Sequence, residues 1–247
     1  MRTVSLVLLS LAGSGRAEPR YPKAIVGSVE LPWREDWSFD EPLFVQHIHK
    51  ELTLTKHIYL FGTAGEGYAL TDAMFKNIST IYAREMKKAG ALETAMLSVI
   101  SLSLPTIRER IEWASSTLGI QTFQLSLPSW GALTDDEVRT FFQWTAGAFP
   151  ALKFWHYNNV RAKRQLNSTL YAELSSKHPN FVGVKTCIND VGWLEQVARA
   201  APDLRLVPNE QGFALAPDWI GAGETTHTWM RSDMQPCLPL LRTLDEI

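Results

Sequence analysis

The sequence has little cysteine, no surplus of either charge, and no long apolar run in its body. It contains only two cysteines, Cys187 and Cys237, which excludes a disulfide framework and a cysteine zinc site. Its 24 Lys and Arg residues nearly balance 26 Asp and Glu residues, so we expect no nucleic-acid partner, since such binders usually carry a basic domain. Past the first residues no run reaches the roughly 18 apolar residues of a membrane span, so we expect no membrane partner.

The sequence does have enough apolar residues to build a sizeable core. The chain has 247 residues, of which 45% are hydrophobic and only 20% are charged. This composition argues against disorder and suits one large domain or two small ones. The length also allows a (β/α)8 barrel, which needs about 250 residues.

The first residues are ambiguous. Arg2 precedes the apolar run 3–12, and small residues follow it (GSG), as in a short secretory signal. A mis-called start, or a first strand packed on the body, explains the same pattern. We therefore treat residues 1–17 as a possible signal peptide or mis-called start, and we assign 18–247 to a single barrel domain.

Short apolar runs with β-branched residues recur along the body and alternate with helical patterns. We expect strands over 24–29, 58–61, 95–100, 122–127, 152–157, 181–185 and 204–207, and a weaker one over 224–229. Helices are expected over about 42–53, 71–88, 106–118 and 134–147, with Thr71 and Thr134 as N-caps. This alternation predicts a parallel sheet. Eight units would close a barrel, whereas fewer would leave an open, doubly wound sheet.

Either fold places the chemistry at the carboxyl ends of the strands, and the second strand ends in a glycine-rich turn. This turn, 62–66 (GTAGE), lets the backbone approach a ligand, and its N–H groups could hold a carboxylate or phosphate. Its spacing matches neither a Walker A loop nor the dinucleotide fingerprint. A tight strand–helix turn explains it as well.

The fifth and sixth strands end in Tyr157-Asn158 and in Lys185. A lysine that finishes an apolar strand is unusual, because burying a charge is costly. If Lys185 points into a barrel, desolvation favours its neutral amine, which is a nucleophile. A lysine that snorkels to the rim is the alternative.

Taken in this order, the three motifs resemble the dihydrodipicolinate synthase/N-acetylneuraminate lyase family of class I aldolases. That family has Gly-Thr/Ser-Thr-Gly-Glu after strand two, Tyr-Asn after strand five and its Schiff-base lysine in Gly-Ile/Val-Lys. The run 178–185 (HPNFVGVK) fits too, and the resemblance extends from about Tyr21 to the C-terminus. It implies a TIM barrel whose C-terminal helical extension is largely missing, since about one helix, near 237–244, follows the eighth strand.

The resemblance also implies roles for individual residues. Lys185 would condense with the ketone of pyruvate or a related 2-oxo acid, and Tyr157 would shuttle protons. Thr63 would hydrogen-bond that tyrosine. The backbone N–H groups of Ala64 and Gly65 would cradle the substrate carboxylate.

Arg161 and the partners follow from the same resemblance, whereas Glu210 is singled out by its place at the end of a strand. Arg161 lies near the place of an arginine that binds a distal carboxylate, and Glu210 after strand seven could contact substrate or be a rim charge. No metal and no organic cofactor are implied. The expected partners are a 2-oxo acid, an aldehyde and further copies of the chain. A cytoplasmic location is expected unless residues 1–17 are an export signal.

Two departures from the family pattern favour an alternative. Ala64 replaces the second hydroxyl residue of the turn, and Pro128-Ser129-Trp130 replaces Pro-Tyr-Tyr. An indole only donates and cannot shuttle a proton as a phenol does. The three motifs lead us to expect a Schiff-base-forming lyase or synthase. The two departures favour the alternative, a catalytically impaired relative that binds a 2-oxo acid or a partner protein.

Two neighbours of these residues are expected to be structural. Strand alternation points His156 away from the site occupied by Tyr157. Cys187 would share a face with Lys185 if the strand continued, and we expect a small thiol packed in the core.

Overall fold

The computed structural model describes residues 24–188, 190–209 and 222–225. These residues alternate between strands and helices, as the sequence predicts. The strands are β1 (Ala24–Val29), β2 (Ile58–Leu60), β3 (Met96–Ser98), β4 (Thr122–Leu125), β5 (Lys153–Asn158), β6 (Phe181–Thr186), β7 (Arg205–Pro208) and β8 (Ala222–Thr225). The α-helices are α1 (Glu41–Leu52), α2 (Asp72–Lys88), α3 (Leu104–Trp113), α4 (Asp135–Trp144), α5 (Ser168–Lys177) and α6 (Val191–Ala200).

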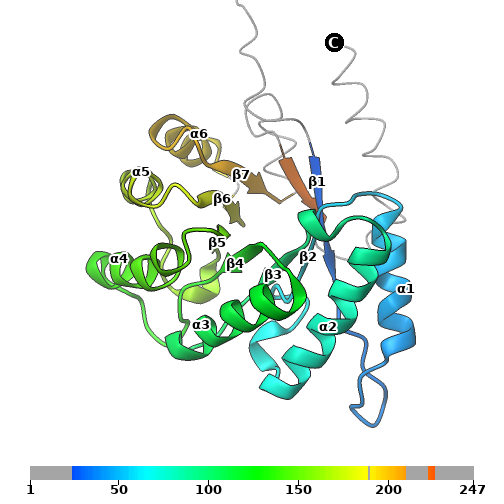
Figure 1. The fold of residues 1–247 in the computed structure, drawn as a ribbon. Coiled ribbons are helices and arrows are strands. Elements are labelled where there is room, and N and C mark those ends of the chain that lie inside the picture. The colour runs from blue at the N-terminus through cyan, green and yellow to red at the C-terminus, as the bar shows by residue number, and fades with distance from the viewer. Residues whose placement is uncertain (1–23, 189, 210–221, 226–247) are drawn as a thin grey trace, which may run out of the picture.

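The strands form one parallel sheet that curls into a ring. Their order is β7-β6-β5-β4-β3-β2-β1-β8, and every neighbouring pair is parallel. β7 and β8, at the two ends of this order, contact each other. Figure 1 shows the six helices outside the strands and β8, the orange arrow, beside β1. The predicted (β/α)8 barrel is confirmed, and the open-sheet alternative is wrong.

All the strands except β1 differ from their predicted bounds by one to four residues at one end or both, and for β2 and β8 the cause is local. β2 ends at Leu60 rather than 61, because Phe61 takes a left-handed backbone angle of +67° that turns the chain away. β8 begins at Ala222, two residues before the predicted start. Alanine and glycine open this strand, and neither residue has the β-branched or aromatic character of a typical strand.

Two apolar layers hold the barrel together. The larger layer fills the space between the strands and the helices, and its fully buried side chains include Phe44, Ile48, Phe75, Tyr82, Phe123, Phe142 and Phe154. The smaller layer fills the barrel interior and consists of Val26, Tyr59, Met96, Trp155 and Val207. Successive side chains of a strand point to opposite faces, so β2 directs Tyr59 inward and its two neighbours outward. The interior layer forms the surroundings of the candidate site.

The helix starts follow the capping signals in the sequence. The hydroxyls of Thr71 and Thr134 accept hydrogen bonds from the third residue of α2 and α4, each at 3.3 Å. The Glu137 carboxylate accepts a hydrogen bond from the Thr134 amide at 2.7 Å, which completes the predicted capping box. The third predicted helix is divided: α3 starts at Leu104, and a π-helical turn over Ala114–Leu118 follows it.

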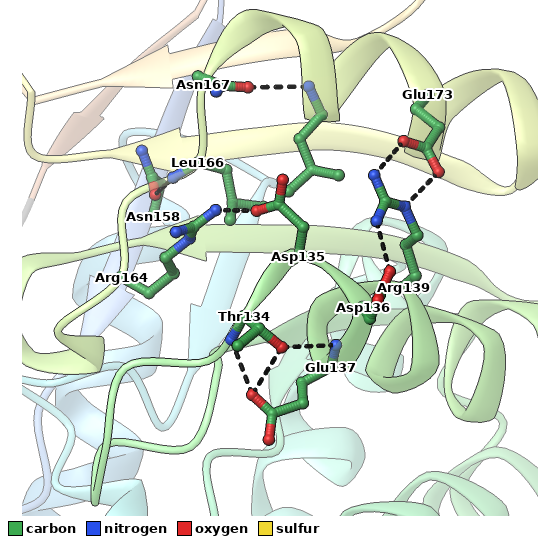
Figure 2. A network of polar contacts seen from close by, with 11 residues as sticks. Thr134, Asp135, Asp136, Glu137, Arg139, Asn158, Arg164, Leu166, Asn167 and Glu173 are labelled. Atoms are coloured by element: carbon green, nitrogen blue, oxygen red, sulfur yellow. Dashed lines mark hydrogen bonds and ion pairs between the residues drawn. The ribbon is translucent and has the colours of Figure 1, made fainter.

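A polar network fixes the loop between β5 and α5 against the start of α4 (Figure 2). Arg164 of the loop pairs with Asp135, the first residue of α4. Buried Asn158 accepts a hydrogen bond from the Leu166 amide at 3.1 Å, and Asn167 caps α5. The loop that carries Arg161 is therefore held at both ends.

We expect the capping box of α4 to contribute measurably to stability. Thr134→Ala should lower the free energy of unfolding by about 1 kcal/mol, because the Glu137 amide at the helix start loses the hydroxyl that accepts its hydrogen bond. In a chain of this size that loss lowers the melting temperature by roughly 2–4 °C. Thr134→Ser keeps the hydroxyl and serves as the control. Equal melting temperatures for the alanine and serine variants would contradict this prediction.

Within the described ranges, no helix combines the length and apolar character needed to cross a membrane. The expectations for residues 1–17, for Cys237 and for the segment 237–244 lie outside the described residues.

Candidate active site

Lys185 is buried inside the barrel near the carboxyl end of β6. It lies in register with Tyr157 of β5 and Val207 of β7, and it is only 4% exposed. Its Nζ donates a hydrogen bond to the hydroxyl of Tyr59 at 2.7 Å. The side chain therefore points into the barrel, and the snorkelling alternative is wrong for this lysine.

The surroundings of the amine are largely apolar and aromatic. Nζ lies 3.7 Å from the centre of the Tyr157 ring and 4.7 Å from the centre of the Tyr59 ring. Burial disfavours the charged ammonium, whereas the faces of two aromatic rings stabilise it. Burial and the two aromatic rings therefore act in opposite directions on the charged form of Lys185.

A small cavity lies beside the amine inside the barrel. Its volume is about 10 Å³, and it is lined by Val26, Tyr59, Met96, Gln124, Trp155, Lys185 and Val207. Such a space holds about one water molecule. A 2-oxo acid is too large to fit in this space.

Tyr157 joins the amine to the residues at the barrel mouth. Its hydroxyl lies 3.5 Å from Cys187 Sγ, and the hydroxyl of Thr63 also hydrogen-bonds it. Burial raises the pKa of the phenol above its ordinary value, and the positive charge of Lys185 and the bond from Thr63 oppose that rise. The structure therefore brings together three residues singled out in the sequence, Lys185, Tyr157 and Thr63.

Cys187 is exposed, so the prediction of a core thiol is wrong. The prediction assumed that β6 continues, but the strand ends at Thr186. Beyond that residue the chain leaves the sheet, and the alternation of inward and outward side chains no longer applies. The thiol comes to lie at the barrel mouth beside Tyr157.

The glycine turn after β2 is closely packed on its neighbours. A Cβ added at Gly62 would lie 2.6 Å from the Tyr59 ring, and one added at Gly65 would lie 3.0 Å from the carbonyl oxygen of Val29. The carboxylate of Glu66 accepts a hydrogen bond from the Trp33 indole at 2.7 Å. These contacts are enough to require small residues, so the tight-turn interpretation of the glycines stays open beside the ligand-binding one.

A larger cavity of about 580 Å³ opens at the carboxyl ends of β2 to β5. Thr63 and Arg161 line it, together with the hydroxyls of Ser101, Ser103, Ser126 and Ser129 and the buried Arg110. Arg161 is positioned by Asn159, whose side-chain oxygen accepts the Arg161 amide at 2.9 Å. The same side chain donates a hydrogen bond to the hydroxyl of Ser126 at 3.0 Å, which ties the loop to the segment directly after β4. Glu210, the remaining predicted substrate contact, lies outside the described residues.

Two further residues lie apart from the amine. Trp130 is 85% exposed, and its carbonyl oxygen accepts a hydrogen bond from Lys163. His156 is fully buried on the helix side of β5, with Nδ1 2.8 Å from the Tyr171 hydroxyl. The prediction that His156 points away from the site is confirmed.

Sequence reasoning missed Tyr59, which contacts the amine, and Asn159, which positions Arg161. A signal for Tyr59 was present: a tyrosine flanked by aliphatic residues in a buried strand has a hydroxyl that needs a partner inside the protein. Asn159 carried no comparable signal, because its partners lie directly after β4 and in its own loop.

Among the residues the structure describes, no group of three or more His, Cys, Asp or Glu side chains could hold a metal ion.

Comparison with known proteins finds similarity to an N-acetylneuraminate lyase in sequence and to dihydrodipicolinate synthases and N-acetylneuraminate lyases in fold. No family model matches the sequence. The N-acetylneuraminate lyase of Rattus norvegicus is 24% identical over 180 residues, which are 68% of this chain and 53% of that protein. The chain thus spans about half the length of this curated relative.

Solved structures share the fold at low sequence identity. The 4-hydroxy-tetrahydrodipicolinate synthase of Methylacidiphilum fumariolicum SolV is 18% identical with a TM-score of 0.77, over 91% of this chain and 74% of that chain. The N-acetylneuraminate lyase of Aliivibrio salmonicida is 17% identical with a TM-score of 0.73, over 83% and 69%. A prophage protein of the dihydrodipicolinic acid synthase family from E. coli K12, solved with pyruvate, is 16% identical with a TM-score of 0.73, over 82% and 69%. The resemblance drawn from the three motifs is confirmed.

Proposed function

We propose that this relative of the dihydrodipicolinate synthases and N-acetylneuraminate lyases forms a Schiff base between Lys185 and pyruvate or a related 2-oxo acid. The observation that carries the proposal is the lysine itself. Its amine lies inside a parallel barrel, 4% exposed, between two tyrosine rings. A buried lysine at the carboxyl ends of barrel strands is costly for folding and suited to covalent catalysis.

The chemistry begins when the neutral amine attacks the ketone carbon. A carbon–nitrogen bond forms while the carbonyl π bond breaks onto oxygen. The oxygen leaves as water, with one proton from the amine and one from a neighbouring acid, and a protonated imine remains. That cation withdraws electrons and stabilises the carbanion that forms when a carbon–carbon bond is made or broken.

The other residues would handle protons and carboxylates. Tyr157 would give and take the protons of these steps, because its phenol is neutral at ordinary pH and is linked to the Thr63 hydroxyl. The amides of Ala64 and Gly65 would hold the carboxylate of the 2-oxo acid. Arg161 lines the 580 Å³ cavity, where an aldehyde partner would lie.

Borohydride trapping tests this function. With pyruvate and borohydride, we expect the intact mass to rise by one reduced pyruvate, located on Lys185 by peptide mapping. Lys185→Arg keeps the positive charge without a nucleophilic amine, and it should show no increase. Lys153→Arg, an exposed lysine at the start of β5, is the matched control and should still be trapped.

A folded protein that gives no adduct with a panel of 2-oxo acids would contradict the proposal. The binding relative is then the better description, and the exposure of Trp130 favours it, since this side chain is free to contact a partner. In that case pyruvate should still raise the melting temperature without forming a covalent bond.

A further inference from the structure

The amine of Lys185 has a hydrogen-bond partner, Tyr59, that belongs to none of the three sequence motifs. Tyr59 lies on β2, 126 residues earlier in the chain, and its hydroxyl accepts a hydrogen bond from Nζ at 2.7 Å. The tyrosine is 2% exposed, and its ring packs against Gly62, where a Cβ would come within 2.6 Å of a ring carbon. The phenol is therefore fixed in place by the backbone of the glycine turn.

We propose that Tyr59 is a positioning residue that holds the Lys185 amine in the barrel interior and sets the pH at which this amine becomes nucleophilic. The proposal rests on the function proposed above. It concerns a different tyrosine and a different kind of contact. Tyr157 contacts the amine through its ring, whereas Tyr59 hydrogen-bonds the reacting nitrogen through its hydroxyl.

The physical reason is the strength of a hydrogen bond to a charged donor. A phenol oxygen that accepts from an ammonium binds it more strongly than it binds a neutral amine, so Tyr59 favours the protonated lysine. The same bond directs Nζ toward β2. Attack on a ketone needs the neutral amine, so this hydrogen bond moves the onset of attack to higher pH.

Few of the side chains around the Lys185 amine can gain or lose a proton. Among side chains that the structure describes, Tyr157 from β5 is the second titratable group against Nζ, and Cys187 touches that phenol. The remaining elements around the amine contribute residues that do not titrate: Val26, Met96, Gln124, Trp155 and Val207. Removing the Tyr59 hydroxyl takes away the oxygen that accepts the hydrogen bond from Nζ.

The test is the pH dependence of trapping by pyruvate and borohydride in Tyr59→Phe. This variant keeps the ring that packs on Gly62 and removes one oxygen. We expect the midpoint of the trapping rate to move lower by about one pH unit, the size of one hydrogen bond to a charged group. The limiting rate at high pH should fall several-fold, since the amine is no longer held in one place.

Tyr82→Phe is the matched control, because it removes the hydroxyl of another buried tyrosine, which bonds the Ile58 carbonyl oxygen. This variant should keep the wild-type midpoint. Melting curves of both variants verify that they are folded. A role in folding alone would lower the melting temperature of Tyr59→Phe without moving the midpoint, and that result would overturn the proposal.

A second readout needs no pyruvate and separates the two proposals. Competitive acetylation of the lysines with acetic anhydride, followed by peptide mapping, gives the reactivity of Lys185 at each pH. If the wild type forms no pyruvate adduct but Lys185 reacts at lower pH in Tyr59→Phe, the Schiff-base function fails and the role of Tyr59 stands. Equal acetylation of Lys185 at every pH in the two proteins overturns the role of Tyr59.

Discussion

The free energy of unfolding should fall by several kcal/mol as the pH drops from 6.5 toward 3, and His156 should be a main cause. Burial lowers the pKa of this histidine from 6.5 to about 3, because no water reaches the imidazole to stabilise its charge. Its Nδ1 lies 2.8 Å from the Tyr171 hydroxyl, and its Nε2 has no hydrogen-bond partner among the described residues. The folded protein has no favourable place for a second proton on this ring.

The sign of this pH dependence follows from whether the folded or the unfolded chain binds the proton on His156. Below pH 6.5 the unfolded chain protonates His156, whereas the folded chain does not until about pH 3. The stability linked to this group is therefore complete above pH 6.5 and is lost as the pH falls toward 3. A pKa difference of this size corresponds to a loss on the order of 5 kcal/mol across the whole range.

Urea unfolding at pH 7.5 and 4.5 measures the effect. In the double variant His156→Phe/Tyr171→Phe both hydrogen-bond partners become apolar rings of similar size, so neither is left unsatisfied. We expect the stability lost between these two pH values to be smaller than in the wild type by about 3 kcal/mol.

Tyr171→Phe alone keeps the imidazole and should lose as much stability on acidification as the wild type. Glu85 does not interfere at these pH values. Hydrogen bonds from Arg84, Lys88 and His49 outweigh its burial and lower its pKa from 4.5 to about 2, so its contribution is lost only in the range between those values. If the double variant and the wild type lost equal stability, His156 would not be the cause.

Gly183→Ala should be among the most damaging single-methyl substitutions in this chain. A Cβ at Gly183 of β6 would lie 2.5–2.6 Å from three atoms of the Trp155 indole, closer than real contacts allow. Trp155 is 8% exposed and belongs to the interior layer of the barrel, so its ring has little room to move. Overpacking of this kind costs about 1–3 kcal/mol, and we expect the upper part of that range.

The damage should reach the candidate site, because Trp155 also lines the cavity beside Lys185. A displaced indole would press on the amine, and trapping by pyruvate should become slower even in the fraction of protein that is folded. Chemical unfolding gives the first effect, and trapping rates at a temperature well below melting give the second.

A smaller residue at position 155 should restore much of the stability. In the variant Gly183→Ala/Trp155→Leu the new methyl group occupies space that the indole has left, so the two substitutions should be coupled by more than about 1 kcal/mol in a double-mutant cycle. Gly131→Ala is the control, since a Cβ there meets no atom within 4 Å. Equal losses for Gly183→Ala and Gly131→Ala would show that the indole is not under steric constraint.

The sequence by itself determined the alternation of strands and helices, the helix starts and the order of the three motifs. These features depend on residues close together in the chain. The capping box of α4 needs only Thr134 and Glu137, and the apolar runs mark strands through their own side chains. For the same reason β8 was the least accurate strand: its alanine and glycine carry little local preference, and only pairing with β1 defines it.

The tertiary structure alone decided what surrounds the reactive amine. Tyr59 and Lys185 are 126 residues apart, and they meet because the barrel brings the inward-facing residues of β2 and β6 to the same interior layer. Cys187 is exposed because the sheet ends one residue earlier. Whether a lysine snorkels or is buried depends on side chains from strands distant in sequence, and local patterns carry no information about them. The sequence motifs therefore identify Lys185 as a candidate catalytic residue, whereas the residues that contact it can be identified only from the closed barrel.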